Sequence, residues 1–445
     1  MTSPSGTDLT REQADALVRS RGFTVLLAVA AVIGVLVSLV AWCFLEAVHW
    51  VQEEAYVHLP HAFGYADGPP TWWPLPVLAL TGVLVAAAIT RLPGEGGHVP
   101  VHGLSASGPA NPAELPGIVL AALASLGLGV VLGPEAPLIA LGAGFAVWTL
   151  RLARREVPAQ ATAVVAATGS FAAISFIFGS PVVAAVILIE ATGLGGHRLR
   201  IILLPGLLGA GIGSLVSLGM GSLTGLSDSD YALGALPVAT FTRPDITDFL
   251  WTVPLAVVIA IVAQLILRLG RRAEPVLSAR RFVALPIAGL AIAGLAILFS
   301  QVTGDSQNLV LFSGEEALPD LVKDADTFTL GALLLLIALK GVAYSLSLGG
   351  FRGGPAFGAL FIGAAAGVIA SRLPGFELTP AIAVGMAAAF ASVLALPLSA
   401  VVLATLLVSK AGYGAEPLII VAVVVSYIVT LHIGARQEHL ARASS

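Results

Sequence analysis

Charge and cysteine are scarce in this sequence. Only 11% of its 445 residues are charged, whereas a typical soluble protein has roughly 25%. A chain so poor in charge has too few charged residues to form a water-soluble surface. We therefore expect a multi-pass membrane protein whose outer surface faces the lipid bilayer. The single cysteine, Cys43, has no partner for an intrachain disulfide. A net charge of -4 gives no basic surface for a nucleic acid, and none is expected as a partner.

The sequence also lacks the motifs of the common enzyme and metal sites. The spacing of Glu53, Glu54, His58 and His61 matches no metal geometry. The glycine-rich run 349–354 lacks the Lys-Ser/Thr pair of a phosphate-binding loop. No Ser/His/Asp or Cys/His arrangement stands in a credible site. We therefore predict no enzyme activity, no metal and no cofactor.

Long apolar runs, by contrast, are frequent. Residues 23–45 and 71–90 each exceed the roughly 18 residues that span a bilayer, and 157–189 is long enough for two tight passes. Arginines gather between pairs of expected crossings, whereas 302–326 holds six acids and one lysine. Because basic loops stay on the cytoplasmic side, we expect both termini of this plasma-membrane protein to be cytoplasmic.

An internal repeat divides the chain. GPEAPLIALGAG at 133–144 resembles GPAFGALFIGA at 354–364, an offset near 220 residues. Downstream, 169–181 and 385–397 have equal lengths, and each ends in a proline that opens a short apolar helix. An odd number of crossings in the first half would invert the second, as in many transporters. The alternative is ordinary packing of helices through small residues.

The repeat predicts an all-α membrane fold of two inverted halves with tilted and broken helices. We expect five parts, in this order: a cytoplasmic N-terminal segment 1–20, a first half 21–267, a basic cytoplasmic linker 268–281, a second half 282–433 and a cytoplasmic tail 434–445.

Glu135 is the only charged residue between Leu115 and Leu150. Burying a carboxylate in lipid costs several kcal/mol unless it is neutralised, hydrated or functional. It lies in LGPEAP at 132–137, where Gly133 and two prolines mark a chain break and a helix start. A helix that begins inside the membrane directs unpaired N–H groups at an anion. A carboxylate there can compete with a mobile anion until it is protonated. The alternatives are a helix cap or a paired structural acid.

These motifs resemble those of the CLC family of chloride channels and proton-coupled chloride transporters. LGPEAPLIALG is similar to the family signature Gly-Arg-Glu-Gly-Pro, with Glu135 in the place of the gating glutamate. GGHVP at 96–100 resembles the segment Gly-Ser-Gly-Ile-Pro, and GFRGGPAFGALFIGA at 350–364 resembles Gly-x-Phe-x-Pro. GDSQNL at 304–309 and Lys340 also resemble family features. The resemblance is to a divergent prokaryotic-type member without C-terminal regulatory domains.

The resemblance implies transport of chloride or a similar small anion, with protons as a second candidate, by a homodimer with one pathway per subunit. It gives Glu135 the role of a protonatable gate. It also places nine residues around the anion: Gly97, His98, Val99, Gly133, Pro134, Ala136, Pro355, Ala356 and Phe357.

Two departures leave the transport mode open. Gly97 or His98 stands where the family has its anion-binding serine, and Ala191 stands where coupled members have an inner proton-transfer glutamate. Glu190, next to it, is a candidate substitute relay; the alternative is a residue that faces the cytoplasm near Arg198 and Arg200. Both an uncoupled channel and a proton-coupled antiporter fit these residues. Two further hypotheses are a fluoride-selective relative and, from a different class of protein, an integral membrane enzyme or scaffold.

Overall fold

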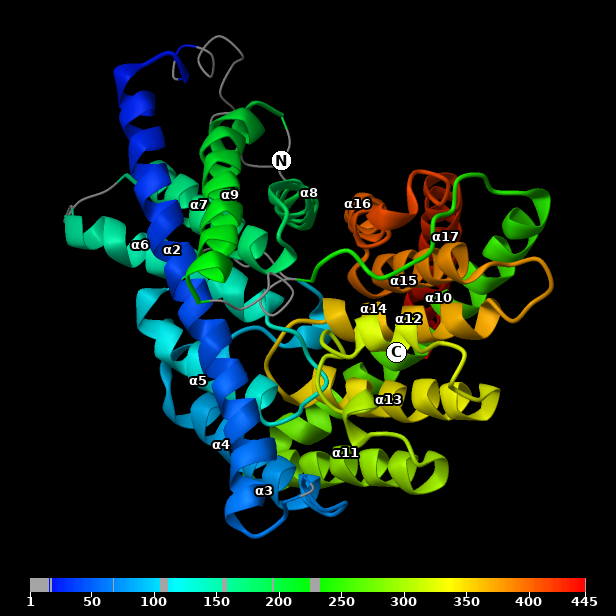
Figure 1. Cartoon of the computed structure of the whole chain (residues 1–445). Helices are drawn as coiled ribbons and strands as arrows, with labels where there is room; N and C mark the ends of the chain where they lie inside the picture. Colours follow the sequence, from blue (N-terminus) through cyan, green and yellow to red (C-terminus); the bar gives the residue numbers. More distant parts are fainter. Residues whose placement is uncertain are drawn as a thin grey trace. The chain divides into compact units, whose positions relative to one another are not determined.

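The protein is described from a computed structural model (Figure 1), which describes residues 16, 18–66, 68–104, 111–153, 158–193, 196–224 and 233–444. Most of the predicted segment 1–20 lies outside them. The described residues fold into helices, and the one β-type pairing among them is an isolated antiparallel bridge between Gly133 and Gly354. The predicted all-α fold is confirmed.

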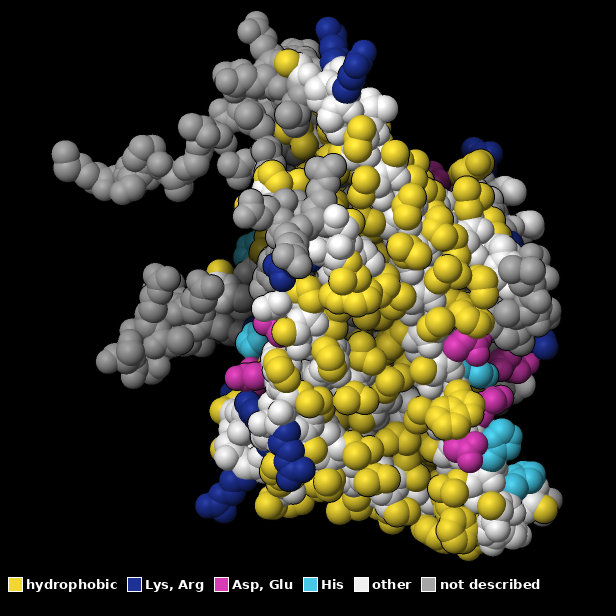
Figure 2. Space-filling model, turned by 90° about the vertical axis from the view of Figure 1, so that its left-hand side faces the viewer, with side chains coloured by type: hydrophobic (Ala, Val, Ile, Leu, Met, Phe, Trp, Pro, Cys, Tyr) yellow, Lys and Arg dark blue, Asp and Glu magenta, His cyan; other side chains and the backbone are white. Residues whose placement is uncertain are grey.

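Nine helices within the described ranges are long and apolar enough to cross a membrane. On the face drawn in Figure 2, hydrophobic side chains cover most of the described surface, and charged side chains gather toward its margins. Exposed residues such as Val32, Leu80 and Leu215 are apolar, as lipid contact requires. The nine spans are Arg21–Ala62, Pro74–Arg91, Glu135–Ala153, Ala161–Phe178, Ile201–Met220, Ile246–Ala279, Arg281–Thr303, Leu330–Gly350 and Glu416–Ala435.

The chain divides into two compact units, and the first comprises residues 1–44, 105–115 and 138–232. It holds the start of α2 (Arg21–Glu53), most of α6 (Glu135–Ala153), α7 (Ala159–Phe178), α8 (Pro181–Thr192) and α9 (Gly196–Thr224). Helices α6 and α7 approach closely through Gly142 and Gly169, because a Cβ on Gly142 would lie 2.5 Å from the Gly169 carbonyl oxygen. Small residues allow such contact in membrane helices.

The second unit comprises residues 45–104, 116–137 and 233–445. Helices α14 and α15 pack through Gly363 and Gly385, and every residue of α15 from Thr379 to Leu394 is buried. Its helices include the end of α2, η1 (Glu54–His58), α3 (Leu59–Ala62), α4 (Pro74–Arg91), η2 (Pro93–Gly96), η3 (Pro100–His102), α5 (Leu115–Gly127), α10 (Ile246–Ala279), α11 (Arg281–Thr303), η6 (Gln307–Leu309), α12 (Leu318–Lys323), α13 (Leu330–Gly350), α14 (Ala356–Ala370), α15 (Leu378–Leu394), α16 (Pro397–Leu407), η7 (Ser409–Ala411) and α17 (Glu416–Ser444); η4 (Pro112–Glu114) precedes α5.

The order of helices follows the predicted repeat. The series α6, α7 and α8 recurs as α14, α15 and α16, with a glycine contact between the first two helices in each series. The short helices α8 and α16 both begin with a proline, Pro181 and Pro397. Proline suits this position because the N–H that it lacks would have no partner within the helix. Ser180 adds an N-cap to α8 by accepting from the Val183 N–H.

The predicted division at 268–281 stays a prediction. This basic stretch is helical: α10 runs to Ala279, α11 begins at Arg281, and the chain turns at Arg280. No residue of 268–274 breaks a helix, and Pro275 lies inside α10. The tail from residue 434 likewise continues α17.

Candidate anion site

Glu135 is the first residue of α6 and lies in the second compact unit. It follows a buried, non-helical stretch at 128–134, and its side chain is 0% exposed. The backbone N–H of Ala356 donates a short hydrogen bond to Oε1 of Glu135, whereas Oε2 has no hydrogen-bond partner among the described residues. A buried carboxyl group is thus held by the N-terminus of a helix that begins 221 residues further along the chain.

Two glycines make room for this carboxyl group. The Gly133 N–H donates to the Gly354 carbonyl at 2.8 Å, and the Gly354 N–H donates back to the Gly133 carbonyl at 2.5 Å. A Cβ on either glycine would collide with the carboxyl group of Glu135, and a Cβ on Gly133 would also lie 2.5 Å from Cδ2 of Phe357. Glycine is required at both positions by this close approach.

The N-terminus of α14 provides the favourable electrostatics. The N–H groups of Ala356 and Phe357 face the Glu135 carboxyl group, and both residues are 1% exposed. The first N–H groups of a helix have no partner within the helix, and they carry partial positive charge. A helix N-terminus of this kind can bind an anion, and here it binds the carboxyl group of Glu135. Pro355, also buried, precedes the helix, and its carbonyl oxygen accepts from the Tyr344 hydroxyl.

The remaining predicted residues of the signature segment flank the carboxyl group in sequence. Pro134 is buried and Ala136 is half-buried in the first turn of α6.

The first segment predicted to face the anion is connected to this region through an arginine. Gly97, His98 and Val99 are half-buried, and no hydrogen bond among the described residues joins them to Glu135. Instead Nε of Arg352 donates to the Glu95 carbonyl at 3.3 Å. The helix that follows the segment, η3, has only three residues.

Arg352 is 6% exposed and ties three stretches of backbone together. Its Nη1 donates to the carbonyls of Phe351 at 3.1 Å and Gly350 at 3.4 Å, and its own N–H donates to Oγ of Ser125 at 3.2 Å. These bonds hold the approach to α14 against α5 and the turn at Glu95.

His98 lies near this arginine network, and the charge of Arg352 acts on its imidazole. Burial lowers the pKa of His98 below 6.5, and the neighbouring His102, whose ring centroid is 6.1 Å away, lowers it further. Its Nε2 is buried without a hydrogen-bond partner in the described part of the chain. His102 pairs with Glu274 at 3.0 Å, and Arg281 lies 3.8 Å from Glu95. Burial and His102 therefore both favour the neutral form of the His98 imidazole.

Comparison with known proteins decides the family. The family model described as "Voltage gated chloride channel" matches residues 94–431, which include Glu135 and the 350–357 segment. This chain belongs to the voltage gated chloride channel (CLC) family. The resemblance stated from the sequence motifs is confirmed.

The relatives of this CLC protein agree. The protein YfeO of Salmonella schwarzengrund, an ion-transport protein by its name, is 32% identical over 360 residues, which cover 79% of this chain and 81% of YfeO. YfeO of Salmonella newport is 32% identical over 362 residues, with the same two coverages. Anion transport of the CLC type is accordingly the function of this protein.

Two solved structures share the fold. The crystal structure of a slow cyanobacterial Cl-/H+ antiporter superposes with a TM-score of 0.73 at 18% identity, covering 92% of this chain and 95% of its own. A CLC-type fluoride/proton antiporter superposes with a TM-score of 0.68 at 17% identity, covering 95% and 97%. The CLC-like fold predicted from the sequence is confirmed.

Three residues near the CLC site did not emerge as site residues from the sequence: Tyr344, Arg352 and Glu315. Tyr344 and Arg352 donate to backbone carbonyls on either side of Gly354, and the contact of Tyr344 leaves no local pattern in the sequence. Glu315 was visible only as one of six acids in 302–326. The RGG run beginning at Arg352, a charge inside an apolar region, is the signal that identifies that residue.

Lys340, singled out by its resemblance to the family, is fully buried in α13. Its Nζ donates to the carbonyl oxygens of Leu309, Val310, Leu311 and Phe312 at 2.9 to 3.3 Å. It also lies 4.5 Å from the centroid of the Phe361 ring. This ammonium group organises the loop after α11 and does not reach the Glu135 carboxyl group.

Glu190, the candidate inner relay, lies in the first compact unit. It is half-buried in the last turn of α8, and its carbonyl accepts from the N–H of Gly193 at 3.3 Å.

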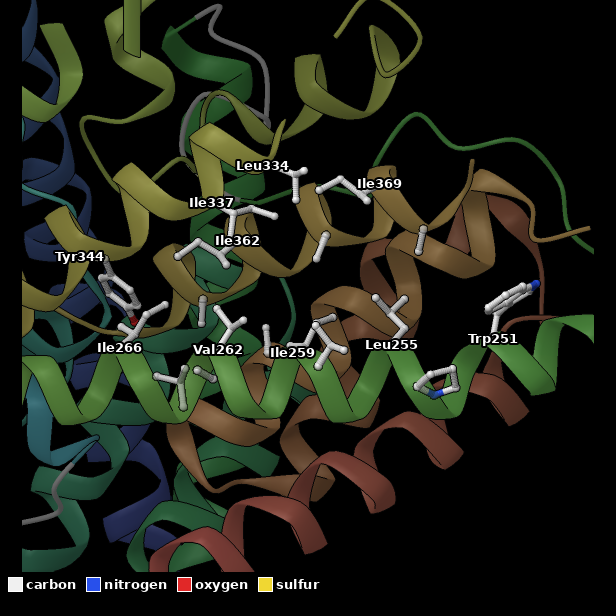
Figure 3. A pocket seen from close by; sticks show the side chains of 18 of the residues that line it. Trp251, Leu255, Ile259, Val262, Ile266, Leu334, Ile337, Tyr344, Ile362 and Ile369 are labelled. Atoms are coloured by element: carbon white, nitrogen blue, oxygen red, sulfur yellow. The ribbon is translucent and has the colours of Figure 1, made fainter. Parts of the chain in front are cut away.

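An apolar cavity of about 340 Å³ lies between α10, α13, α14 and α15. Figure 3 shows Tyr344 at one end and Trp251 near the other, with isoleucine and leucine side chains between them. Almost all of the lining is apolar, so an anion there would lose its hydration without compensation. This lining offers almost no polar surface to an anion, although Tyr344 borders the cavity while its hydroxyl donates to the Pro355 carbonyl.

Proposed function

We propose that Glu135 is the protonatable gate of the anion pathway in this CLC protein. One observation carries the proposal: the buried carboxyl group accepts the Ala356 N–H at the N-terminus of α14. While ionised, the carboxylate fills the place of a mobile anion. Protonation removes its charge and weakens its hold on the helix end. An anion from solution then takes its place, and flux rises as the pH falls.

The transported ion in this proposal is chloride or a small anion like it. The N–H groups of Ala356 and Phe357 recognise negative charge without requiring a shape. One structural neighbour is named as a Cl-/H+ antiporter and the other as a fluoride/proton antiporter. Because they are only 18% and 17% identical to this chain, its preference between the two anions has to be measured. Efflux of both ions from the same liposomes ranks them.

The experiment measures anion efflux from liposomes at about pH 8 and about pH 4.5. We expect wild-type efflux to rise several-fold on acidification. Glu135→Gln and Glu135→Ala are expected to transport at both pH values, without the rise. Asp324→Asn, which changes an exposed acid, is the matched control. Efflux from Glu135→Ala that still follows pH as in wild type excludes the gating role.

Proton coupling is a separate part of the proposal. Glu190 is the candidate relay on the cytoplasmic side, next to Ala191. We expect opposed chloride and pH gradients to shift the reversal potential away from the chloride equilibrium value if protons are exchanged, and Glu190→Gln to abolish that shift. A reversal potential at the chloride value in the wild type identifies an uncoupled channel.

Assembly and orientation complete the proposal. The protein acts as a homodimer in the plasma membrane, with one pathway per subunit and both termini in the cytoplasm. Native mass spectrometry of the purified protein tests the dimer, and labelling of tags at each terminus in intact cells tests the orientation.

A further inference from the structure

The Glu135 carboxyl group must exchange its proton with water although it is fully buried. Its side chain is 0% exposed, and Oε2 has no partner among the described residues. A group that titrates during each gating event needs a route for protons to the surface. Side chains that bridge the distance are the usual solution in membrane proteins.

The loop between α11 and α12 contacts both the stretch before Glu135 and helix α14. The Phe312 N–H donates to the Gly129 carbonyl at 3.1 Å, in the stretch that leads to Glu135. Gly314, with φ +87°, lies so close to α14 that a Cβ would be 2.6 Å from the Phe361 ring. The four carbonyl bonds of Lys340 hold the preceding residues in place. The loop therefore has a fixed position beside the carboxyl site.

Glu315 follows directly and is half-buried. Its N–H donates to Oγ of Ser313 at 3.1 Å, which fixes the direction of the turn. Burial raises the pKa of Glu315 well above its usual range, and the negative charges of Glu135 and then Glu316 raise it further. Glu315 thus lies within electrostatic reach of Glu135, and it makes no ion pair within the described part of the chain.

The other polar and charged groups around the loop are either exposed to solvent or already hydrogen-bonded. Glu316, the next residue, has a side chain that is 79% exposed, and one of its carboxylate oxygens lies 4.0 Å from Nδ1 of His49. The Lys340 ammonium group is occupied by four carbonyls, and Tyr56, whose ring lies 5.3 Å from that of Phe312, donates its hydroxyl to Leu128. Exposure therefore falls stepwise from Glu316 through Glu315 to Glu135.

We propose that Glu315 relays protons between water and the buried carboxyl group of Glu135. This inference rests on the proposed gating role of Glu135. In the inward step the O–H bond of a protonated Glu315 breaks, and an O–H bond forms on the Glu135 carboxylate, directly or through one water molecule. Glu315 is left ionised and regains a proton from water. Two neighbouring carboxylates repel each other, so the pair readily holds one shared proton.

The relay predicts an effect that a merely structural residue would not produce. In Glu315→Gln the proton donor is gone, whereas the size of the side chain is kept. The response of efflux to a rapid pH step on the loop side is therefore expected to slow several-fold. The midpoint pH of efflux is expected to stay close to that of wild type, because the amide replaces a carboxyl group whose raised pKa keeps it protonated while Glu135 titrates. Glu315→Asp keeps a carboxyl group and restores a rate close to that of wild type.

The test is efflux after a rapid pH step for Glu315→Gln, Glu135→Gln and the double variant, with Asp324→Asn as the control for a lost exposed charge. We expect the slower response only where Glu135 is present, and no additional effect of Glu315→Gln on the flat pH profile of Glu135→Gln. A pH-dependent Glu135→Gln overturns the gate itself. A flat Glu135→Gln together with an unchanged rate in a folded Glu315→Gln overturns the relay alone. If Glu315→Gln fails to fold, the relay is overturned by Glu315→Ser with a wild-type rate.

Discussion

The carboxyl group of Glu135 accepts a hydrogen bond from the backbone N–H of Ala356, which lies 221 residues further along the chain. The antiparallel bridge between Gly133 and Gly354, each two residues earlier, brings the two segments together. A helix N-terminus thereby meets an acid instead of a free anion. The predictions below test the parts of this arrangement.

Gly354→Ala tests the space around the carboxyl group. The new methyl group would collide with the Glu135 carboxyl group, so the carboxyl group must leave the Ala356 N–H. We expect efflux whose pH dependence is at least halved, measured in liposomes at about pH 8 and about pH 4.5. Gly294→Ala, at an exposed position of α11 with no atom within 4 Å, should behave as wild type. A wild-type pH profile for Gly354→Ala would contradict the geometry.

Lys340→Met tests the loop that follows α11. Methionine fills a similar volume but donates no hydrogen bond, so four carbonyl oxygens lose their donor. Leaving buried acceptors unpaired should lower the free energy of unfolding by about 3 kcal/mol. Thermal unfolding in detergent measures this loss. Lys323→Met, at an exposed position, is expected to unfold at the wild-type temperature. Equal unfolding temperatures for the two variants would refute the prediction.

Arg352→Gln tests the connection between the turn at Glu95 and the segment that leads to α14. Glutamine is too short to reach the carbonyls of Glu95, Gly350 and Phe351 together. We expect a loss of about 2 kcal/mol in stability and a several-fold fall in efflux, because the approach to α14 is no longer held in place. Arg281→Gln removes a partly exposed ion pair of 3.8 Å with Glu95 and is the control. The idea fails if both arginine variants transport equally well.

His98→Asn tests the neutral state of that imidazole. Because the pKa of His98 is lowered in the folded protein, the unfolded chain binds this proton more tightly. Stability is therefore lost as the pH falls below about 6.5, the ordinary histidine pKa. We expect His98→Asn to show a smaller drop in unfolding temperature between about pH 7.5 and about pH 5 than wild type. His61→Asn, at an exposed histidine, should show the wild-type drop. Identical drops in all three proteins would show that His98 is not responsible.

Much of the architecture could be predicted from local patterns. Scarce charge and long apolar runs dictate membrane helices, because lipid admits little else. Glycine and proline mark helix ends, since proline lacks an N–H and glycine tolerates close approach, and so the starts of α6, α8 and α16 were readable. A single acid in an apolar stretch identified Glu135 as the residue to examine.

The sequence by itself thus determined that this is a membrane protein, that it contains an internal repeat of helices, and that Glu135 is a lone acid in an apolar stretch. Only the tertiary structure decided which groups meet that acid: the Ala356 N–H on one side and the loop with Glu315 on another. It also decided that Lys340 bonds to a loop and Arg352 to a turn. Sequence patterns report periodicity over a few residues, whereas these contacts join segments tens to hundreds of residues apart. Which distant segments meet is decided by the packing of the helices.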